Sequence, residues 1–265
     1  MSAIPFWFWA TSAGLFGLAM GSFFTVLTYR WPREESLVSP RSRCTSCQHQ
    51  LRWYENIPVV SWLALGRKCG SCREPISWRY PALELATAGL GAGSIIAFGA
   101  NWRGLAVMVM ALALVPVVVI DLQHKLIPNI VTYPAAVLAL TFAVLDNPSR
   151  WWVPVAGAFG AATFLFVLWV IKPAGMGLGD VKLALLLGAV LGASVIPAFF
   201  IAFAAGAILG IVLMASQGMK ARKNQNSLWP LPGRRSSAFA LGRPDADHHV
   251  HRQARIAPSC FLTPL

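Results

Sequence analysis

Two aspartates stand at the edges of long apolar stretches in this sequence of 265 residues. Asp121 closes the apolar run of "VPVVVIDLQHKLIPN", and Asp180 follows Gly175, Gly177 and Gly179 in "GMGLGDVKL". When two carboxylates lie a few ångströms apart they share one proton, because both cannot ionise cheaply. The ionised partner then takes a proton from an attacking water, and the protonated partner supports the oxyanion and the leaving amine. The pair therefore predicts aspartyl-protease chemistry.

Each aspartate also has a plainer interpretation as a helix cap or an interface charge. Asp180 is expected near a helix N-terminus, where the helix dipole favours a carboxylate. A charge at or inside a bilayer is costly, however, so two such residues indicate a function. Glycines give the chain torsions that other residues avoid and allow close approach of a substrate backbone. We predict Asp121 and Asp180 as the catalytic pair, with Gly177, Gly179 and Lys182 as supporting residues of the motif.

Four cysteines form a second candidate site. Cys44 and Cys47 make one C-x2-C pair, and Cys69 and Cys72 make another 21 residues later. Two such pairs supply four thiolates to a tetrahedral zinc ion, which leaves no position for water and makes the metal structural. Disulfides are the alternative, but they are rare in a reducing cytoplasm. His49 is a further possible ligand, although a lone histidine so close to a pair more often lies at the surface.

The elements that must position these residues are hydrophobic helices. The sequence is 56% hydrophobic and 12% charged, whereas a soluble domain carries about 25% charged residues. It predicts an all-α polytopic membrane protein with about seven transmembrane helices and a cytoplasmic zinc-ribbon-like loop after the first. Residues 181–215 are alternatively one broken helix. The predicted spans are 4–28, 82–100, 104–120, 131–145, 152–171, 181–193 and 195–215.

The basic residues predict how the chain is oriented. The net charge is +12, and residues 29–81 hold nine Lys and Arg against four Glu. The positive-inside rule places this loop in the cytoplasm. Counting spans from there places Asp121 and Asp180 at the same cytoplasmic membrane face, so that they can meet. Membrane topology already explains the basic charge, and we therefore expect no nucleic-acid partner.

The same reading divides the chain into four parts. Residues 1–28 form the first transmembrane helix, 29–81 the cysteine loop, and 82–217 a transmembrane peptidase core. Residues 218–265 contain eight Lys and Arg and no apolar run long enough to span a membrane. This composition predicts a basic C-terminal tail, disordered or aberrant in sequence, that stays in the cytoplasm.

Six motifs in a fixed order resemble a known family. They are "GLAMGSFFTVLTYRWP", the two C-x2-C pairs taken together, "YENIPVVSWL", "ISWRYPALEL", "IDLQHKLIPN" and "GMGLGDVKL". In this order the set resembles the bacterial type IV prepilin peptidases, bifunctional leader peptidases and N-methyltransferases of the G-x-G-D aspartyl protease class. The resemblance implies that Asp121 and Asp180 are the catalytic pair, and it associates the cysteine loop with zinc and the methyltransferase half.

The resemblance also implies a substrate and a location. Prepilin or pseudopilin precursors of pilus and type II secretion systems lose a short leader at the cytoplasmic face of the bacterial inner membrane. The new N-terminus is then methylated from S-adenosylmethionine. Two departures stand out: Thr25 replaces a common Asn, and residues 218–265 replace a segment that ends in a further helix. An inactive homologue with a defective C-terminus is therefore one alternative. A transporter that relays protons through carboxylates is another, disfavoured because both aspartates lie at one face.

Overall fold

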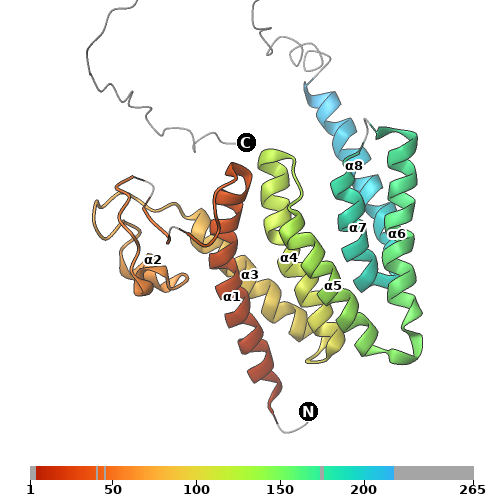
Figure 1. The fold of residues 1–265 in the computed structure, drawn as a ribbon, viewed down its shortest axis with the longest axis horizontal. Helices are drawn as coiled ribbons and strands as arrows, with labels where there is room; N and C mark the ends of the chain where they lie inside the picture. Colours follow the sequence, from red (N-terminus) through yellow and green to blue (C-terminus); the bar gives the residue numbers. More distant parts are fainter. Residues whose placement is uncertain (1–3, 40, 45, 174–175, 218–265) are drawn as a thin grey trace, which may run out of the picture. The chain divides into compact units, whose positions relative to one another are not determined.

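The computed structural model describes residues 4–39, 41–44, 46–173 and 176–217. Long helices dominate this part of the chain (Figure 1), and it contains no β-strand, only two isolated β-bridges. The predicted all-α fold is confirmed. The chain divides into two units, Met1–Leu209 and Gly210–Leu265, and the last turns of α8 are the described part of the second. The helices are α1 (Phe6–Arg30), α2 (Val60–Ala64), α3 (Arg79–Phe98), α4 (Trp102–His124), α5 (Asn129–Asp146), α6 (Trp152–Ile171), α7 (Leu178–Leu191) and α8 (Val195–Gln217).

Six helical stretches of the described residues are long and apolar enough to cross a membrane. The sixth, Leu178–Gly206, contains α7 and the first half of α8. A short 3-10 turn, η5 (Gly192–Ser194), separates these two helices, and Gly192 has a φ of +53°. Glycine adopts such a torsion without steric penalty, and Figure 1 shows the chain turning back into α8 at this point. The prediction of about seven transmembrane helices agrees with this arrangement.

Small residues let α1 and α3 pack with their backbones almost touching. A Cβ added to Gly17 of α1 would collide with the Thr87 carbonyl of α3, and one added to Gly21 would lie 2.7 Å from Cα of Glu84. Close backbone approach of this kind is how helices associate where no water drives them together. The contact fixes the start of α3, from which the cysteine loop departs, against the end of α1.

The helices that carry the two aspartates share one small core. Ala113 of α4, Ala136 of α5 and Leu186 of α7 are all buried and belong to the same apolar cluster. Alanine side chains bring the three helix axes close together, so a shift of any one helix is passed to the other two. This cluster holds α4, α5 and α7 together.

Candidate active site and metal centre

Asp180 lies in the first turn of α7, near the N-terminus that the sequence predicts. The backbone N–H of Gly177, the residue before the helix, donates to Oδ2 of Asp180 over 3.1 Å. The Asp180 N–H in turn donates to the Gly177 carbonyl, also over 3.1 Å. These two bonds satisfy groups that a helix N-terminus otherwise leaves open. The carboxylate is therefore held at the N-terminal end of α7, where Asp180 is half-buried.

The described glycines of the motif do not have the unusual torsions that the sequence led us to expect. Neither Gly177 nor Gly179 has a positive φ, so neither torsion requires glycine. A Cβ on Gly179 would instead lie 2.8–2.9 Å from three side-chain carbons of Ile127, whereas one on Gly177 would meet nothing closer than 3.7 Å. Gly179 is needed for close packing of α7, and the expected unusual torsion is wrong for both residues. Gly175 lies outside the described residues.

Asp121 lies inside the last turn of α4. The sequence places it at the end of an apolar run, but the helix continues for three more residues to His124. The Asp121 carbonyl accepts from the N–H of Lys125, whose φ of +54° ends the helix. The Asp121 side chain is exposed. The chain then passes through Pro128, which starts α5 as the sequence predicts.

The start of α7 packs against the link between α4 and α5. The contact of Gly179 with Ile127 is one part of this interface. The other is Lys182, whose Nζ donates to Oδ1 of Asn129 over 2.8 Å and lies 5.5 Å from the centre of the Tyr133 ring. The structure therefore brings the segments that carry Asp121 and Asp180 to the same end of the helical bundle. It also gives Lys182 a definite partner, which the motif alone did not.

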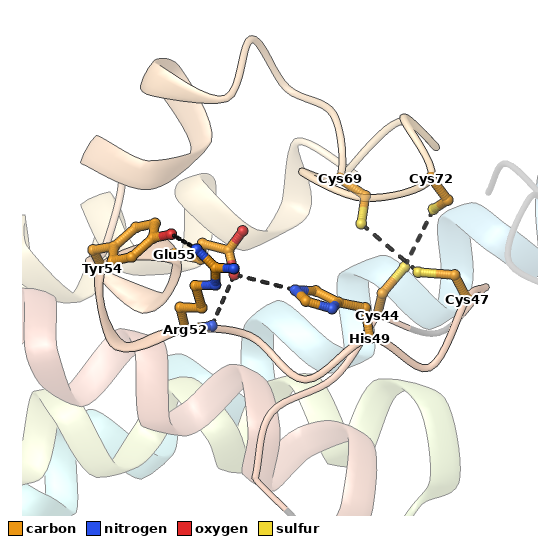
Figure 2. Close-up of polar contacts among 8 residues, drawn as sticks. All are labelled: Cys44, Cys47, His49, Arg52, Tyr54, Glu55, Cys69 and Cys72. Atoms are coloured by element: carbon orange, nitrogen blue, oxygen red, sulfur yellow. Dashed lines mark hydrogen bonds and ion pairs between the residues drawn. The ribbon is translucent and has the colours of Figure 1, made fainter.

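The four predicted cysteines converge on one point (Figure 2). All four sulfur atoms lie within 4.8 Å of one another, with 3.8 Å between Cys44 and Cys72 and 4.0 Å between Cys47 and Cys69. Thiolates at a Zn–S distance of about 2.3 Å in a tetrahedron are about 3.8 Å apart. The cluster has the size and donor set to hold a metal ion such as zinc, with all four positions filled by protein.

The two cysteine pairs are copies of one backbone motif, displaced by 25 residues. The N–H of Cys44 donates to the His49 carbonyl over 2.9 Å, and the N–H of Cys69 donates to the Glu74 carbonyl over 2.8 Å. We call each copy a knuckle: residues 42–51 and 67–76. The sequence analysis missed this repeat, because only the two cysteines and the serine between them recur as letters. The matching β-bridges join Arg43 to Gln50 and Lys68 to Pro75.

The thiols of the cluster have unequal proton affinities. The backbone N–H groups of Cys72 and Ser71 donate toward the Cys69 sulfur and lower the pKa of Cys69 to about 6. At Cys72 the N–H of Glu74 also favours the thiolate, but desolvation and the neighbouring thiols outweigh it and raise the pKa to about 12. Negative charge crowded at one point resists further ionisation. Four thiolates at this spacing therefore need a cation among them.

Glu55 joins the two knuckles, a role that sequence reasoning missed. Its side chain is only 8% exposed, and Oε2 accepts from the Arg52 N–H over 2.8 Å. His49 of the first knuckle places Nε2 3.6 Å from the same oxygen, so this histidine lies outside the cysteine cluster (Figure 2). Oε1 lies against Gly70 of the second knuckle, where a Cβ would come within 2.7 Å. The Glu55 carboxylate thus lies between the two knuckles and contacts both.

Glu84 joins the loop to the helical bundle and was also missed. It is a buried residue of α3, and Oε2 accepts from the backbone N–H of Val59 over 2.8 Å. Val59 has a φ of +58°, which β-branched residues rarely adopt. The hydrogen bond holds this unfavourable turn in place immediately before α2. Sequence could not show it, because donor and acceptor are 25 residues apart.

An apolar pocket lies away from both sites. It has a volume of about 560 Å³ and lies between the first half of α6 and the start of α8. Its walls are apolar and include Gly157, Gly160, Phe164 and Phe199. No titratable side chain lines it. It contributes nothing to acid–base or metal chemistry.

Comparison with known proteins identifies the class. Residues 15–98 match the family model described as "Bacterial Peptidase A24 N-terminal domain", and residues 108–211 match the "Type IV leader peptidase family". The fold and these matches define a multi-pass membrane protein of the leader peptidase class.

The relatives narrow the class to one family. We describe three relatives, each named prepilin leader peptidase/N-methyltransferase. The protein from Myxococcus xanthus is 36% identical over 85% of this chain and 70% of its own length. That from Pseudomonas aeruginosa is 33% identical over 82% and 83%, and that from Bacillus subtilis is 36% identical over 82% and 86%. The chain belongs to the prepilin leader peptidase/N-methyltransferase family. No solved structure matches it.

Proposed function

We propose that this protein cleaves the leader from type IV prepilin or pseudopilin precursors and then N-methylates the new N-terminus. Family membership supports both activities. The observation that carries the cleavage half is the packing of the α7 start on the α4–α5 link, through Gly179 with Ile127 and Lys182 with Asn129. It brings the segments of Asp121 and Asp180 together at one end of the bundle.

Asp121 and Asp180 are the catalytic pair of this proposal. The Gly177 N–H donates to Oδ2 of Asp180 and orients this carboxylate, which acts in the proposal as the base of the pair. It takes a proton from water, and the oxygen of that water forms a bond to the scissile carbonyl carbon. Asp121 gives its proton to the carbonyl oxygen. When the C–N bond breaks, the leaving amine receives the proton held by Asp180, and a hydroxyl of the intermediate returns a proton to Asp121 as the new carboxyl group forms.

The cysteine loop serves the methyl-transfer half. Zinc held by Cys44, Cys47, Cys69 and Cys72 stabilises the loop, and the tetrahedral fit of the sulfurs supports this assignment. S-adenosylmethionine supplies the methyl group: a bond forms from the new N-terminal nitrogen to that carbon, the S–CH₃ bond breaks, and the amine releases a proton. In this view residues 29–81 form the cysteine loop and 82–217 the peptidase core.

The location follows from charge. The basic residues between 29 and 81 favour the cytoplasmic side of the bacterial inner membrane. The ends of α1, α4 and α6 lie on that side in this arrangement, and so does the start of α7. Leader cleavage and methylation then occur at one membrane face, where the precursor's leader emerges from the bilayer.

Replacement of each aspartate tests the catalytic pair. Membranes from cells that express the full chain are incubated with a pilin-like precursor, and leader removal is followed by mass spectrometry. Asp121→Asn and Asp180→Asn should each slow cleavage by about a thousandfold or more, and the double variant should be no slower, because the two act as a unit. Asp146→Asn is the matched control, since Asp146 accepts from the Arg103 N–H at the other end of α5. Near-normal processing by either single variant would falsify the assignment.

A further inference from the structure

Exposed apolar side chains gather on and just before the short helix α2. Val60 and Leu63 are 58% and 63% exposed, and a spacing of three places them on one face of the helix. Trp53 and Ile57, which precede α2, are also exposed. Contiguous apolar surface is unfavourable in water, so its concentration in this loop indicates a contact site. We call Val60 and Leu63 the α2 face.

Two hydrogen bonds fix the depth of α2 relative to the spanning helices. Val59, at its start, donates to Glu84, the sixth residue of α3. Trp62 donates from Nε1 to the carbonyl of Ile76, three residues before α3 begins, over 3.2 Å. At about 1.5 Å per residue, Glu84 lies about 7.5 Å along α3. α2 therefore lies beside the first turns of a spanning helix (Figure 1).

This depth corresponds to the boundary of a bilayer. The polar layer on each side of the hydrocarbon core is about 5–7 Å thick. Trp78 and Tyr80, at the start of α3, and Tyr29, near the end of α1, are exposed at the ends of two spanning helices. Aromatic residues in such positions form the belt at the membrane–water boundary. The α2 face is thus at a depth where lipid is its neighbour.

Charge at the end of α2 suits the same partner. Arg67 and Lys68 follow the helix and are exposed, and the Arg67 guanidinium lies 5.8 Å from the centre of the Trp62 ring. Basic residues next to an anionic leaflet each add about 1 kcal/mol of attraction. An apolar face with a basic border is typical of helices that lie in the interface plane.

We propose that α2 is an interfacial anchor. Its face, Val60 and Leu63, inserts into the headgroup and upper acyl region of the bilayer that α1 and α3 cross, and Arg67 and Lys68 contact anionic headgroups. The knuckles are thereby held at the membrane surface and do not tumble as a free cytoplasmic domain. The proposal is independent of the proposed enzymatic function, since it rests on exposure, depth and charge alone.

Depth-dependent fluorescence quenching tests the anchor in the full-length protein. A fluorescent amino acid is placed at Leu63, at Glu74 as the aqueous reference, or at Leu90 in the middle of α3 as the deep reference. The protein is reconstituted in phosphatidylglycerol-containing vesicles whose lipids carry bromine high or low on the acyl chain. Quenching at Leu63 should reach about half or more of that at Leu90, and shallow bromine should quench it better than deep bromine. Glu74 should be quenched little by either.

A second set of variants separates the anchor from other causes. Val60→Gln with Leu63→Gln should raise the exchange of loop amides with solvent in vesicles, whereas Val38→Gln, at an exposed apolar position outside the α2 face, should not. Quenching at Leu63 equal to that at Glu74 overturns the proposal. Quenching or protection that disappears when the protein is diluted in lipid also overturns it, because a second copy of the chain would then cover the face.

Discussion

The cysteine loop and the aspartate end of the bundle are built in different ways. Each knuckle is closed by backbone hydrogen bonds within ten residues, so that Cys44 and Cys69 are positioned by their immediate neighbours. The aspartates are positioned by contacts between segments far apart in the sequence, such as Lys182 with Asn129, 53 residues away. One site is specified locally, and the other only when α4, α5 and α7 have packed.

This difference predicts how the two sites fail. A change in helix packing should displace Asp180 from Asp121 and leave the knuckles intact, because the backbone hydrogen bonds that close each knuckle join residues of that knuckle. Loss of the metal should release four mutually repelling thiols and disorder the loop, while the apolar cluster around Leu186 remains packed. The two activities of the family should therefore be separable by mutation.

Of the changes that distinguish the two regions, removal of the metal ligands is expected to have the largest effect. The purified protein should contain about one zinc per chain, and Cys44→Ser with Cys47→Ser should lose it. Because the folding of such loops depends on the metal, methylation should fall by about a hundredfold or more, with cleavage within about threefold of the parent. Metal analysis and separate assays of the two products provide the measurement.

The control for that experiment is Cys260→Ser, which removes the fifth cysteine of the sequence and leaves both knuckles unchanged. It should keep stoichiometric zinc and both activities. Stoichiometric zinc in the double variant would contradict the four-thiolate site. Equal loss of cleavage and methylation would show that the loop and the aspartate end are not independent.

The next largest effect is expected at Gly179. Gly179→Ala pushes a Cβ into Ile127, and overpacking of this kind costs about 1–3 kcal/mol. Because α7 must shift to relieve it, cleavage should fall by about ten- to a hundredfold, and zinc content should not change. The initial rate of leader removal is the measurement.

Gly177 provides the matched control from the same motif. Its torsions, φ −84° and ψ 150°, suit any residue, and its Cβ would meet only ordinary contacts. Gly177→Ala weakens a helix cap and should slow cleavage by no more than about threefold. If Gly177→Ala proves as damaging as Gly179→Ala, the glycines serve access of the substrate and not the packing of α7.

The contrast between the regions also explains what could be predicted from the sequence. The cysteine spacing identified the metal cluster, and Pro128 and the glycines before Asp180 marked two helix starts, because each signal is local. Glu55 and Glu84 were missed because each accepts its 2.8 Å hydrogen bond from a backbone N–H, which leaves no trace in residue types. The knuckle repeat was missed for the same reason: Gln48 and Arg73 occupy equivalent left-handed positions without resembling each other.

The packing between helices far apart in the sequence could not be predicted either. The sequence motif contains Gly179 and Lys182, but nothing in it points to Ile127 or Asn129 as their partners. Helix lengths were underestimated where polar residues continue an apolar helix, as at Asp121, because hydropathy ends before the backbone hydrogen bonds do. Such bonds are satisfied within the helix whatever the side chain, so α4 continues to His124.

Lys182 is expected to show a smaller effect than the metal ligands or Gly179, and it gives the sharpest test of long-range positioning. Lys182→Met removes the hydrogen bond to Asn129 and the cation near the Tyr133 ring while it keeps the length of the side chain. An exposed bond of this kind contributes about 1 kcal/mol, so kcat for cleavage should fall by about fivefold with little change in KM.

Asn129→Ala should reproduce that loss, and the double variant should add almost nothing, because both changes break one contact. Lys172→Met, at an exposed basic residue just after α6, should have no effect and controls for the loss of positive charge near the membrane. If Lys182→Met abolished cleavage and Asn129→Ala cleaved at the normal rate, Lys182 would touch the substrate or the aspartates directly. The aspartate end would then depend on a charge at the reacting atoms, and packing between helices would be the lesser part of its design.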